Sequence, residues 1–227
     1  MTRIIKGVFD FQERVFGSKR TLFRQLGAGQ RPLALFITCS DSRINPNLLT
    51  QTEPGELFVL RNAGNLVPPQ GSPPSGEAAT IEYAVHHLHV RDVILCGHSK
   101  CGAMQGLLAP QAVSDMPAVA DWLKVAGPCV ERAKARVPDG ASPALLQAVI
   151  EQNVLLQVEH LQSLPSVQQS AAAGRLRLHA WVYDFENGGV TAYDPRSERF
   201  VPLAESPRRK LLVPMTAAEP EPADPNM

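Results

Sequence analysis

The stretch Pro32-Leu33-Ala34-Leu35-Phe36-Ile37-Thr38 is an unbroken apolar run, and it ends in Cys39-Ser40-Asp41-Ser42-Arg43. A short apolar run without alternation is typical of a strand that is buried on both faces of a parallel sheet. A similar run, Asp92–Cys96, ends in Gly97-His98-Ser99-Lys100-Cys101-Gly102, and Leu57–Leu60 forms a third candidate strand between them. Two of the three predicted strands therefore end in residues that can bind metal or carry out chemistry.

The segments around these strands complete the predicted fold. A helical pattern over Glu77–Leu88 precedes the Asp92 strand, and a longer one covers Ala144–Leu164. Leu176–Asp184 predicts a further strand, and Asn187-Gly188-Gly189 provides a hairpin turn into the strand Val190–Tyr193. The order of strands and helices predicts an α/β fold, with a mostly parallel central sheet flanked by helices and a late antiparallel strand.

The two ends of the chain carry different patterns. Ile4, Val8, Phe11 and Val15 recur at three- and four-residue steps, which predicts an amphipathic N-terminal helix that stops at Gly17-Ser18. A second short helix is expected over Thr21–Leu26, with Thr21 as its N-cap. Residues 1–215 are expected to form a single domain. Residues 216–227, which contain three prolines and only acidic charges, predict a disordered tail.

Composition excludes several classes of protein. The 227 residues include 22 Lys+Arg and 22 Asp+Glu, so there is no charge footprint for nucleic acid or for an anionic membrane. No apolar run approaches the roughly 20 residues that span a bilayer, and charged residues interrupt the N-terminus too early for a signal peptide. A cytoplasmic location is expected. Disulfides are rare there, so the four cysteines raise the question of metal binding or catalysis.

Cys39, His98 and Cys101 are expected to be neighbours, because the carboxyl ends of parallel strands lie at one edge of a sheet. Two thiolates and an imidazole form a three-ligand zinc set that leaves a fourth position for water or substrate. Asp41 could accept a hydrogen bond from zinc-bound water, or it could swing into the fourth position and close the site. Arg43 could hold that carboxylate in a two-bond pair. Spacing alone leaves both arrangements open.

Simpler interpretations compete with these assignments. Free cysteines are often small buried apolar residues, which is the expected role of Cys96 inside its strand and of Cys129 in a chemically quiet region. For Cys39 and Cys101, placement at strand ends beside charged residues favours metal binding. The Asp41–Arg43 pair could be only structural, but charged groups beside an open metal position usually tune it. His160 and His179 have ordinary structural explanations.

The cluster His86-His87-Leu88-His89 is a second candidate metal tract. Adjacent residues on a helix point about 100° apart, so His86 and His87 do not readily face one ion. A solvated helix end is the favoured interpretation.

The ordered set of motifs at 39–43 and 97–102 resembles the β-class carbonic anhydrases. The likeness covers nearly the whole chain to about Pro207, and it includes Pro54–Val59, Arg61–Asn65 and Ile81–Val85. It is most similar to the plant-type branch and to the bacterial enzymes associated with cyanate metabolism.

The resemblance implies one zinc per chain on Cys39, His98 and Cys101, with Asp41 as a further ligand only in a closed form. It implies reversible hydration of carbon dioxide to bicarbonate and a proton through zinc-bound hydroxide, assisted by an Asp41–Arg43 dyad.

The same resemblance assigns further residues. Gln30, Phe58 and Tyr83 match the positions that line the family's small carbon dioxide pocket, with the backbone of Gly102 nearby. Tyr83 and His87 match a possible proton path. Position 63 is Ala where plant enzymes often carry Val, so the pocket is expected to be slightly roomier.

Phe36 stands where one branch of the family has a Trp that marks a non-catalytic bicarbonate site. The open form, with Asp41 paired to Arg43, is therefore expected near neutral pH. The apolar face of the N-terminal helix needs a covering surface, and dimers of this family wrap that helix around the neighbour. A homodimer or a higher homo-oligomer is expected.

Three other functions remain as alternatives. A related fold hydrolyses carbon disulfide, and an assay of both gases separates the two reactions. A zinc-holding binding or sensory module that has lost catalysis would show no hydration in a stopped-flow assay, and the intact Asp41 and Arg43 argue against it. A thiol redox protein would carry a close Cys-x-x-Cys pair, and this sequence has none.

Overall fold

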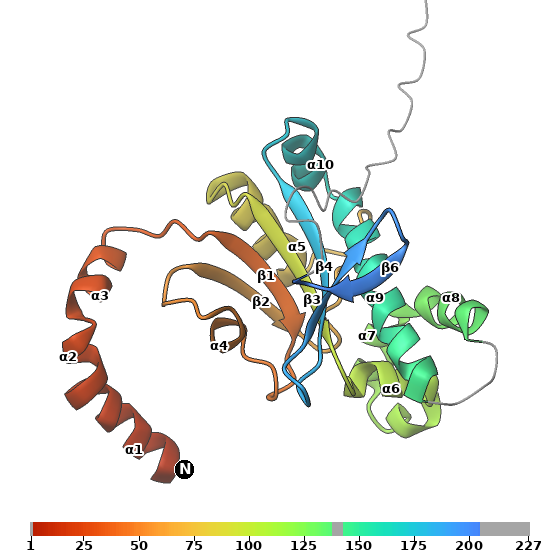
Figure 1. Cartoon of the computed structure of the whole chain (residues 1–227), viewed down its shortest axis with the longest axis horizontal. Helices are drawn as coiled ribbons and strands as arrows, with labels where there is room; N and C mark the ends of the chain where they lie inside the picture. Colours follow the sequence, from red (N-terminus) through yellow and green to blue (C-terminus); the bar gives the residue numbers. More distant parts are fainter. Residues whose placement is uncertain (1, 138–142, 205–227) are drawn as a thin grey trace, which may run out of the picture.

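A six-stranded sheet with the strand order β2-β1-β3-β4-β5-β6 forms the centre of the computed structural model, which describes residues 2–137 and 143–204 (Figure 1). Strands β2, β1, β3 and β4 are parallel, whereas β5 and β6 are each antiparallel to the strand before them. The predicted mostly parallel sheet with a late antiparallel strand is confirmed. The strands are β1 (Ala34–Cys39), β2 (Leu57–Asn62), β3 (Asp92–His98), β4 (Arg177–Tyr183), β5 (Val190–Asp194) and β6 (Arg199–Pro202).

Strand β1 is buried along its whole length, which explains its unbroken apolar sequence. Alternate residues point to opposite faces of a strand. Leu35 and Ile37 lie in the main core, whereas Phe36 packs on the other face in a smaller cluster with Cys96. The ring of Phe36 meets Trp181 edge-on, with 6.3 Å between ring centroids. Both faces of the central strands are therefore covered.

Helices cover the sheet and connect its strands. Helix α5 (Gly76–Glu82) continues as the π-helical turn η2 (Tyr83–His87), and the long helix α9 (Pro143–Ser163) packs on β3 and β4. No helix within residues 2–137 and 143–204 is both long and apolar enough to cross a membrane. The remaining helices of this body are α4 (Pro46–Thr50), α6 (Gly102–Leu108), η3 (Pro110–Val113), α7 (Pro117–Leu123), η4 (Lys124–Ala126), α8 (Pro128–Arg136) and α10 (Pro165–Ala172).

Gly97 permits the close approach of α9 to β3. A Cβ at this position would lie 2.8 Å from Cγ2 of Val154 and 3.3 Å from Cγ2 of Ile150, closer than ordinary van der Waals contact. The glycine therefore fixes the distance between helix and strand one residue before His98.

The N-terminal segment stands away from the sheet as an arm (Figure 1). It consists of α1 (Thr2–Asp10), η1 (Phe11–Val15), α2 (Phe16–Ser18) and α3 (Arg20–Leu26), so the first helical segment extends through Gly17-Ser18 as expected. The predicted N-cap at Thr21 is wrong, because Lys19 occupies the cap and Thr21 lies in the first turn.

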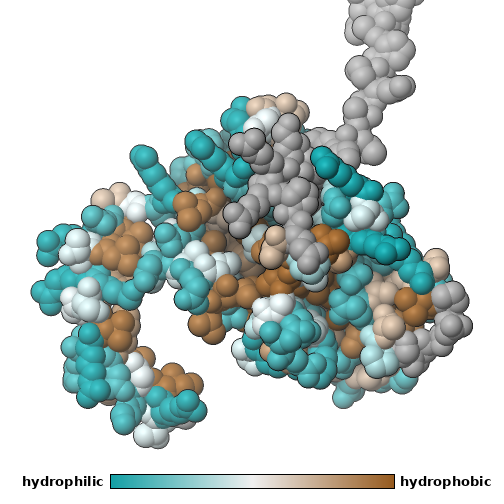
Figure 2. Space-filling view, in the orientation of Figure 1, coloured by the Kyte–Doolittle hydropathy of each residue, from teal (hydrophilic) through white to brown (hydrophobic). Residues whose placement is uncertain are grey.

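The arm exposes its apolar side chains. None of the residues in α1, η1, α2 and α3 is buried, and Ile4 and Phe9 are 69% and 57% exposed. Figure 2 shows these apolar groups as brown patches along the arm. The sequence pattern predicted this amphipathic helix, and no core of the same chain covers it. The predicted tail at 216–227 lies outside the described residues.

Candidate metal centre

Three potential metal ligands meet at the carboxyl edge of the sheet. Cys39 ends β1, His98 ends β3, and Cys101 immediately precedes α6. The two sulfur atoms and a ring nitrogen of His98 lie within 4.8 Å of one another, and all three residues are buried. Strands β1 and β3 are adjacent and parallel, so their ends coincide in space. The structure thus brings together the three residues that were predicted from the sequence to be metal ligands.

The hydrogen bonding of His98 leaves one ring nitrogen for a metal. Its Nδ1 lies 2.9 Å from the carbonyl oxygen of Ser99, which can only accept, so Nδ1 carries the hydrogen. In the neutral ring the lone pair is then on Nε2, and this buried atom has no hydrogen-bond partner among the described residues. A buried polar atom without a partner is costly unless a ligand satisfies it. Two sulfurs and one imidazole nitrogen suit zinc rather than magnesium or calcium.

The two thiols favour a divalent cation electrostatically. A hydrogen bond from Cys101 lowers the pKa of Cys39 despite burial, and contacts with His98 and the backbone N–H of Gly64 act in the same direction. The same thiol–thiol hydrogen bond, together with burial, raises the pKa of Cys101. The pair therefore shares one proton, which a bound metal ion would displace.

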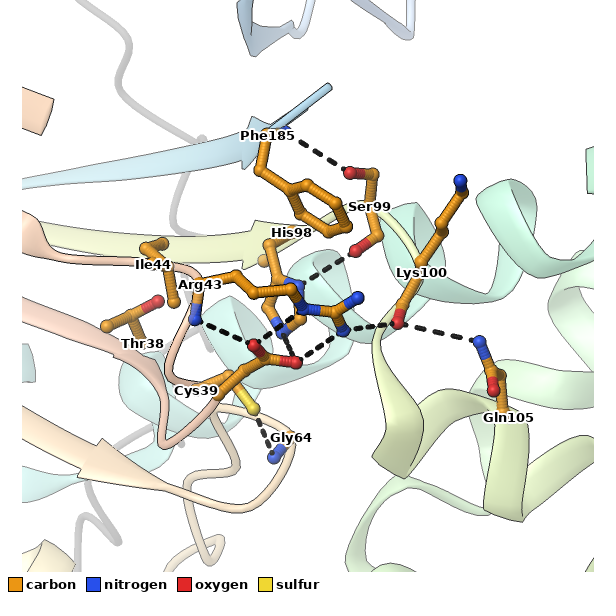
Figure 3. A network of polar contacts seen from close by, with 12 residues as sticks. Thr38, Cys39, Arg43, Ile44, Gly64, His98, Ser99, Lys100, Gln105 and Phe185 are labelled. Carbon is orange, nitrogen blue, oxygen red and sulfur yellow. Dashed lines mark hydrogen bonds and ion pairs between the residues drawn. The ribbon is translucent and has the colours of Figure 1, made fainter. Parts of the chain in front are cut away.

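Asp41 and Arg43 form a two-bond ion pair beside the ligands. Figure 3 shows Arg43 of this pair next to Cys39 and His98. Arg43 donates from Nε to Oδ1 of Asp41 at 2.9 Å and from Nη2 to Oδ2 at 2.6 Å, and its backbone N–H also donates to Oδ1. These hydrogen bonds outweigh partial burial and hold the pKa of Asp41 well below its usual range. The carboxylate is ionised at neutral pH, with Oδ2 only 3.8 Å from Nε2 of His98.

Neighbouring groups hold this ion pair in place. Nη2 of Arg43 donates to the carbonyl of Lys100 at 3.1 Å, and its guanidinium carbon lies 4.4 Å from the ring centroid of Phe185. Arg61, at the end of β2, donates to the carbonyl oxygens of Cys39, Asp41 and Ile44 and so fastens the loop after β1. No sequence pattern predicts these roles of Arg61 and Phe185. The position of Arg61 at a neighbouring strand end was the one available signal.

The predicted pocket residues fall into two places. Gly102 directly follows Cys101 and lies at the metal centre. Gln30 and His87 instead line a hollow of about 730 Å³ that also includes Asp92, at the amino end of β3. The ring of Tyr83 lies 5.9 Å from that of Phe58 and 4.7 Å from that of His87, measured between centroids.

These residues therefore gather away from the metal centre of their own chain. Phe58 pairs with Leu35, which is about 13 Å along β1 from Cys39. Gln30 precedes the amino end of β1, whereas Cys39 is at its carboxyl end. One chain by itself does not place Gln30, Phe58, Tyr83 and His87 around Cys39.

The remaining cysteines and histidines have structural environments. Burial raises the pKa values of Cys96 and Cys129 to about 12, so both remain protonated thiols in the core. His179 contacts Asp92 at 2.7 Å, and His160 bonds to the backbone of Val67. Within the part of the chain that the structure describes, the one group of three or more potential metal ligands is Cys39, His98 and Cys101. The histidines at 86–89 therefore do not form a second such group.

Comparisons with known proteins agree with this geometry. The carbonic anhydrase family model matches residues 34–190. The chain is 48% identical over 208 residues to a carbonic anhydrase of Pseudomonas aeruginosa, which covers 91% of this chain and 94% of that protein.

Solved structures show the same similarity. The β-carbonic anhydrase CcaA superposes with a TM-score of 0.88 at 42% identity, over 93% of this chain and 95% of that chain. A structure from a report on two tetrameric β-carbonic anhydrases of Sordaria macrospora superposes with a TM-score of 0.75 at 27% identity. The match covers 84% of this chain and 95% of that chain. The fold, the buried Cys-His-Cys group and these relatives together show that the chain belongs to the β-class carbonic anhydrases.

Proposed function

We propose that this enzyme catalyses the reversible hydration of carbon dioxide to bicarbonate and a proton at one zinc ion per chain, held by Cys39, His98 and Cys101. The buried, unpartnered Nε2 of His98 beside two sulfurs is the observation that carries the proposal. Zinc would act there as a Lewis acid and lower the pKa of a water molecule in its remaining position toward neutrality. The reaction itself is inferred from membership of the carbonic anhydrase family.

Asp41 orients the attacking water. Its carboxylate stays ionised, so it can accept a hydrogen bond and direct an oxygen lone pair toward the carbon of the substrate. Arg43 occupies both carboxylate oxygens and keeps them from turning onto the metal. This paired arrangement corresponds to the open form, whereas a closed form would need these two hydrogen bonds to break.

A second copy of the chain completes the pocket. Gln30, Phe58 and Tyr83 cluster at the opposite edge of the sheet, so the proposed substrate pocket requires them to come from a neighbour. His87, whose ring centroid lies 4.7 Å from that of Tyr83, would then accept the proton at the metal centre of that neighbour. The exposed apolar arm supplies a surface for association, and tetrameric relatives support a homo-oligomer.

The expected setting follows from the same features. All four cysteines are free, which suits a reducing compartment, and we propose the cytoplasm. The substrate is a small neutral gas, so the zero net charge of the chain is no obstacle to its approach.

The test compares Asp41→Asn with Asp194→Asn, a matched control whose carboxylate only closes a turn with Arg196 and Ser197. Zinc content and stopped-flow hydration are measured from pH 6.5 to 9. Asp41→Asn should keep its zinc and lose about 100-fold in activity, as when an orienting or charge-stabilising group is removed. Full activity would refute the role of Asp41. Carbon disulfide hydrolysis without carbon dioxide hydration by the unmodified enzyme would refute the proposed substrate.

A further inference from the structure

The peptide group between Ala63 and Gly64 is held at both ends. Its N–H, on Gly64, donates to Sγ of Cys39 at 3.4 Å (Figure 3). Its carbonyl, on Ala63, accepts from the indole Nε1–H of Trp122 at 2.8 Å. The peptide is trans, so the carbonyl and the N–H point in opposite directions. Trp122 thus lies at one end of a short hydrogen-bonded chain that ends on a metal-ligand sulfur.

A polar stripe on α9 fixes the next part of the same loop. Asn153, Gln157 and His160 lie four and three residues apart, and therefore on one face of the helix. Asn153 and Gln157 are 1% and 0% exposed, within a helix whose other buried residues are mostly apolar. Asn153 Nδ2 donates to the carbonyl of Gly64 at 3.0 Å.

The hydrogen-bond directions in this stripe are mutually consistent. The backbone N–H of Val67 can only donate, and it does so to Oε1 of Gln157 at 2.8 Å. Nε2 of Gln157 must then donate to Oδ1 of Asn153, at 3.0 Å, which leaves Nδ2 of Asn153 for Gly64. Nδ1–H of His160 donates to the carbonyl of Val67 at 2.8 Å. The loop is therefore fastened at residues 64 and 67 by one continuous network.

Gly64 itself suits this position and would not tolerate a side chain easily. Its φ is +82°, in the left-handed region, and an added Cβ would lie 3.1 Å from Cβ of Ala103. The backbone can approach the sulfur closely only because the residue is glycine.

We propose that Trp122 and Asn153 are positioning residues that hold the Gly64 N–H on the Cys39 sulfur and thereby tune the metal. A hydrogen bond to a thiolate withdraws charge from the sulfur, which makes it a weaker donor and leaves the metal a stronger Lewis acid. The indole N–H polarises the intervening peptide and strengthens that bond. This inference rests on the proposed function, because it concerns the ligand role of Cys39.

The chain contains a matched pair of variants to test this. Trp122→Phe removes the indole N–H that donates to Ala63, whereas Trp181→Phe removes an indole N–H that is buried without a partner among the described residues. The full-length protein is loaded with cobalt(II), and its sulfur-to-cobalt charge-transfer absorption is recorded. Hydration by the zinc form is measured against pH.

Trp122→Phe should shift the charge-transfer band to lower energy, because a sulfur that accepts a weaker hydrogen bond is a stronger donor. The pH of half-maximal hydration should rise by roughly 0.3–0.8 unit. Trp181→Phe should change neither quantity. A Trp122→Phe spectrum and pH profile that superpose on those of the unmodified protein overturn the proposal. Equal shifts in both variants do so as well.

A second pair decides the question if Trp122→Phe does not fold. Asn153→Leu removes the donor to the Gly64 carbonyl, and Gln152→Leu removes an adjacent buried amide whose Nε2 has no partner in the described part of the chain. Only Asn153→Leu should reproduce the two shifts, and their absence overturns the proposal. Failure of the unmodified protein to bind metal or to hydrate carbon dioxide would instead refute the proposed function.

Discussion

Replacing Gly97 by alanine tests how closely α9 must pack on β3 beside the metal centre. The new Cβ would lie 2.8 Å from Cγ2 of Val154, at least about 0.6 Å inside ordinary van der Waals contact, and Ile150 is also too close. Overpacking of a core by one methyl group costs about 1–3 kcal/mol of unfolding free energy. In a domain of this size, each kcal/mol lowers Tm by about 2–4 °C, so we expect a fall of roughly 2–12 °C.

The assay is thermal and urea unfolding of Gly97→Ala, Val154→Ala and the double variant, with zinc content measured in each. Val154→Ala alone should destabilise the protein by leaving a cavity. In the double variant the new methyl group takes the space of the lost one, so the destabilisation should be smaller than the sum of the two single effects by about 1 kcal/mol or more. Strictly additive effects, or a Gly97→Ala variant as stable as the unmodified protein, would refute this account of the packing.

Three further predictions concern charge, association and the ion pair. Burial by itself would raise the pKa of Asp92. Hydrogen bonds from His179 and Arg177 outweigh this effect, and the net result is a pKa lowered from 3.8 to about 2. The stability it contributes, on the order of 1 kcal/mol after allowance for solvent screening, is complete above pH 4 and lost as the pH falls toward 2. The difference between the unmodified protein and Asp92→Asn in urea unfolding should therefore roughly halve between pH 6 and pH 3, and a constant difference would contradict this. Phe9→Glu, on the exposed arm, should reduce the mass of the assembly in light scattering without changing the circular dichroism, and an unchanged mass would exclude this face from the interface. Arg43→Lys keeps the charge but loses the two-bond pairing, so hydration should fall while zinc content stays unchanged, and undiminished activity would show that pairing is dispensable.

The central strands could be predicted because strands buried on both faces give short, continuous apolar runs in the sequence. Strand β1 is buried at all six positions, so every residue from Ala34 to Ile37 is apolar. The sequence does not predict strand β6, Arg199–Pro202, because the strand has no buried residue, is only four residues long and contains a proline. Its position depends on pairing with β5, which no local pattern indicates.

The metal ligands could also be predicted, because the carboxyl ends of parallel strands share one edge of the sheet. Cys39 and His98 each end a strand, and the carboxyl ends of adjacent parallel strands meet. Direction along a strand also explains why Gln30 lies far from the metal: it precedes β1, whereas Cys39 ends it. The family resemblance predicts pocket positions, but it does not predict whether one chain by itself gathers them around the metal centre.

The supporting contacts could not be predicted. Trp122 reaches Ala63 and Asn153 reaches Gly64, across 59 and 89 residues of sequence. Such contacts depend on how helices pack over a loop, and a buried asparagine within an apolar helix is only a hint of one. The sequence therefore indicated the ligands themselves more clearly than the groups that position them.

Zinc content measured together with carbon dioxide hydration tests the central claim most directly, with Cys101→Ser compared to Cys129→Ser. Both cysteines are buried and protonated in the absence of metal, but only Cys101 belongs to the Cys-His-Cys group. The unmodified protein and Cys129→Ser should each hold about one zinc per chain and hydrate carbon dioxide, whereas Cys101→Ser should lose both properties. A Cys101→Ser variant that still holds one zinc per chain, or an active enzyme without zinc, would contradict the account.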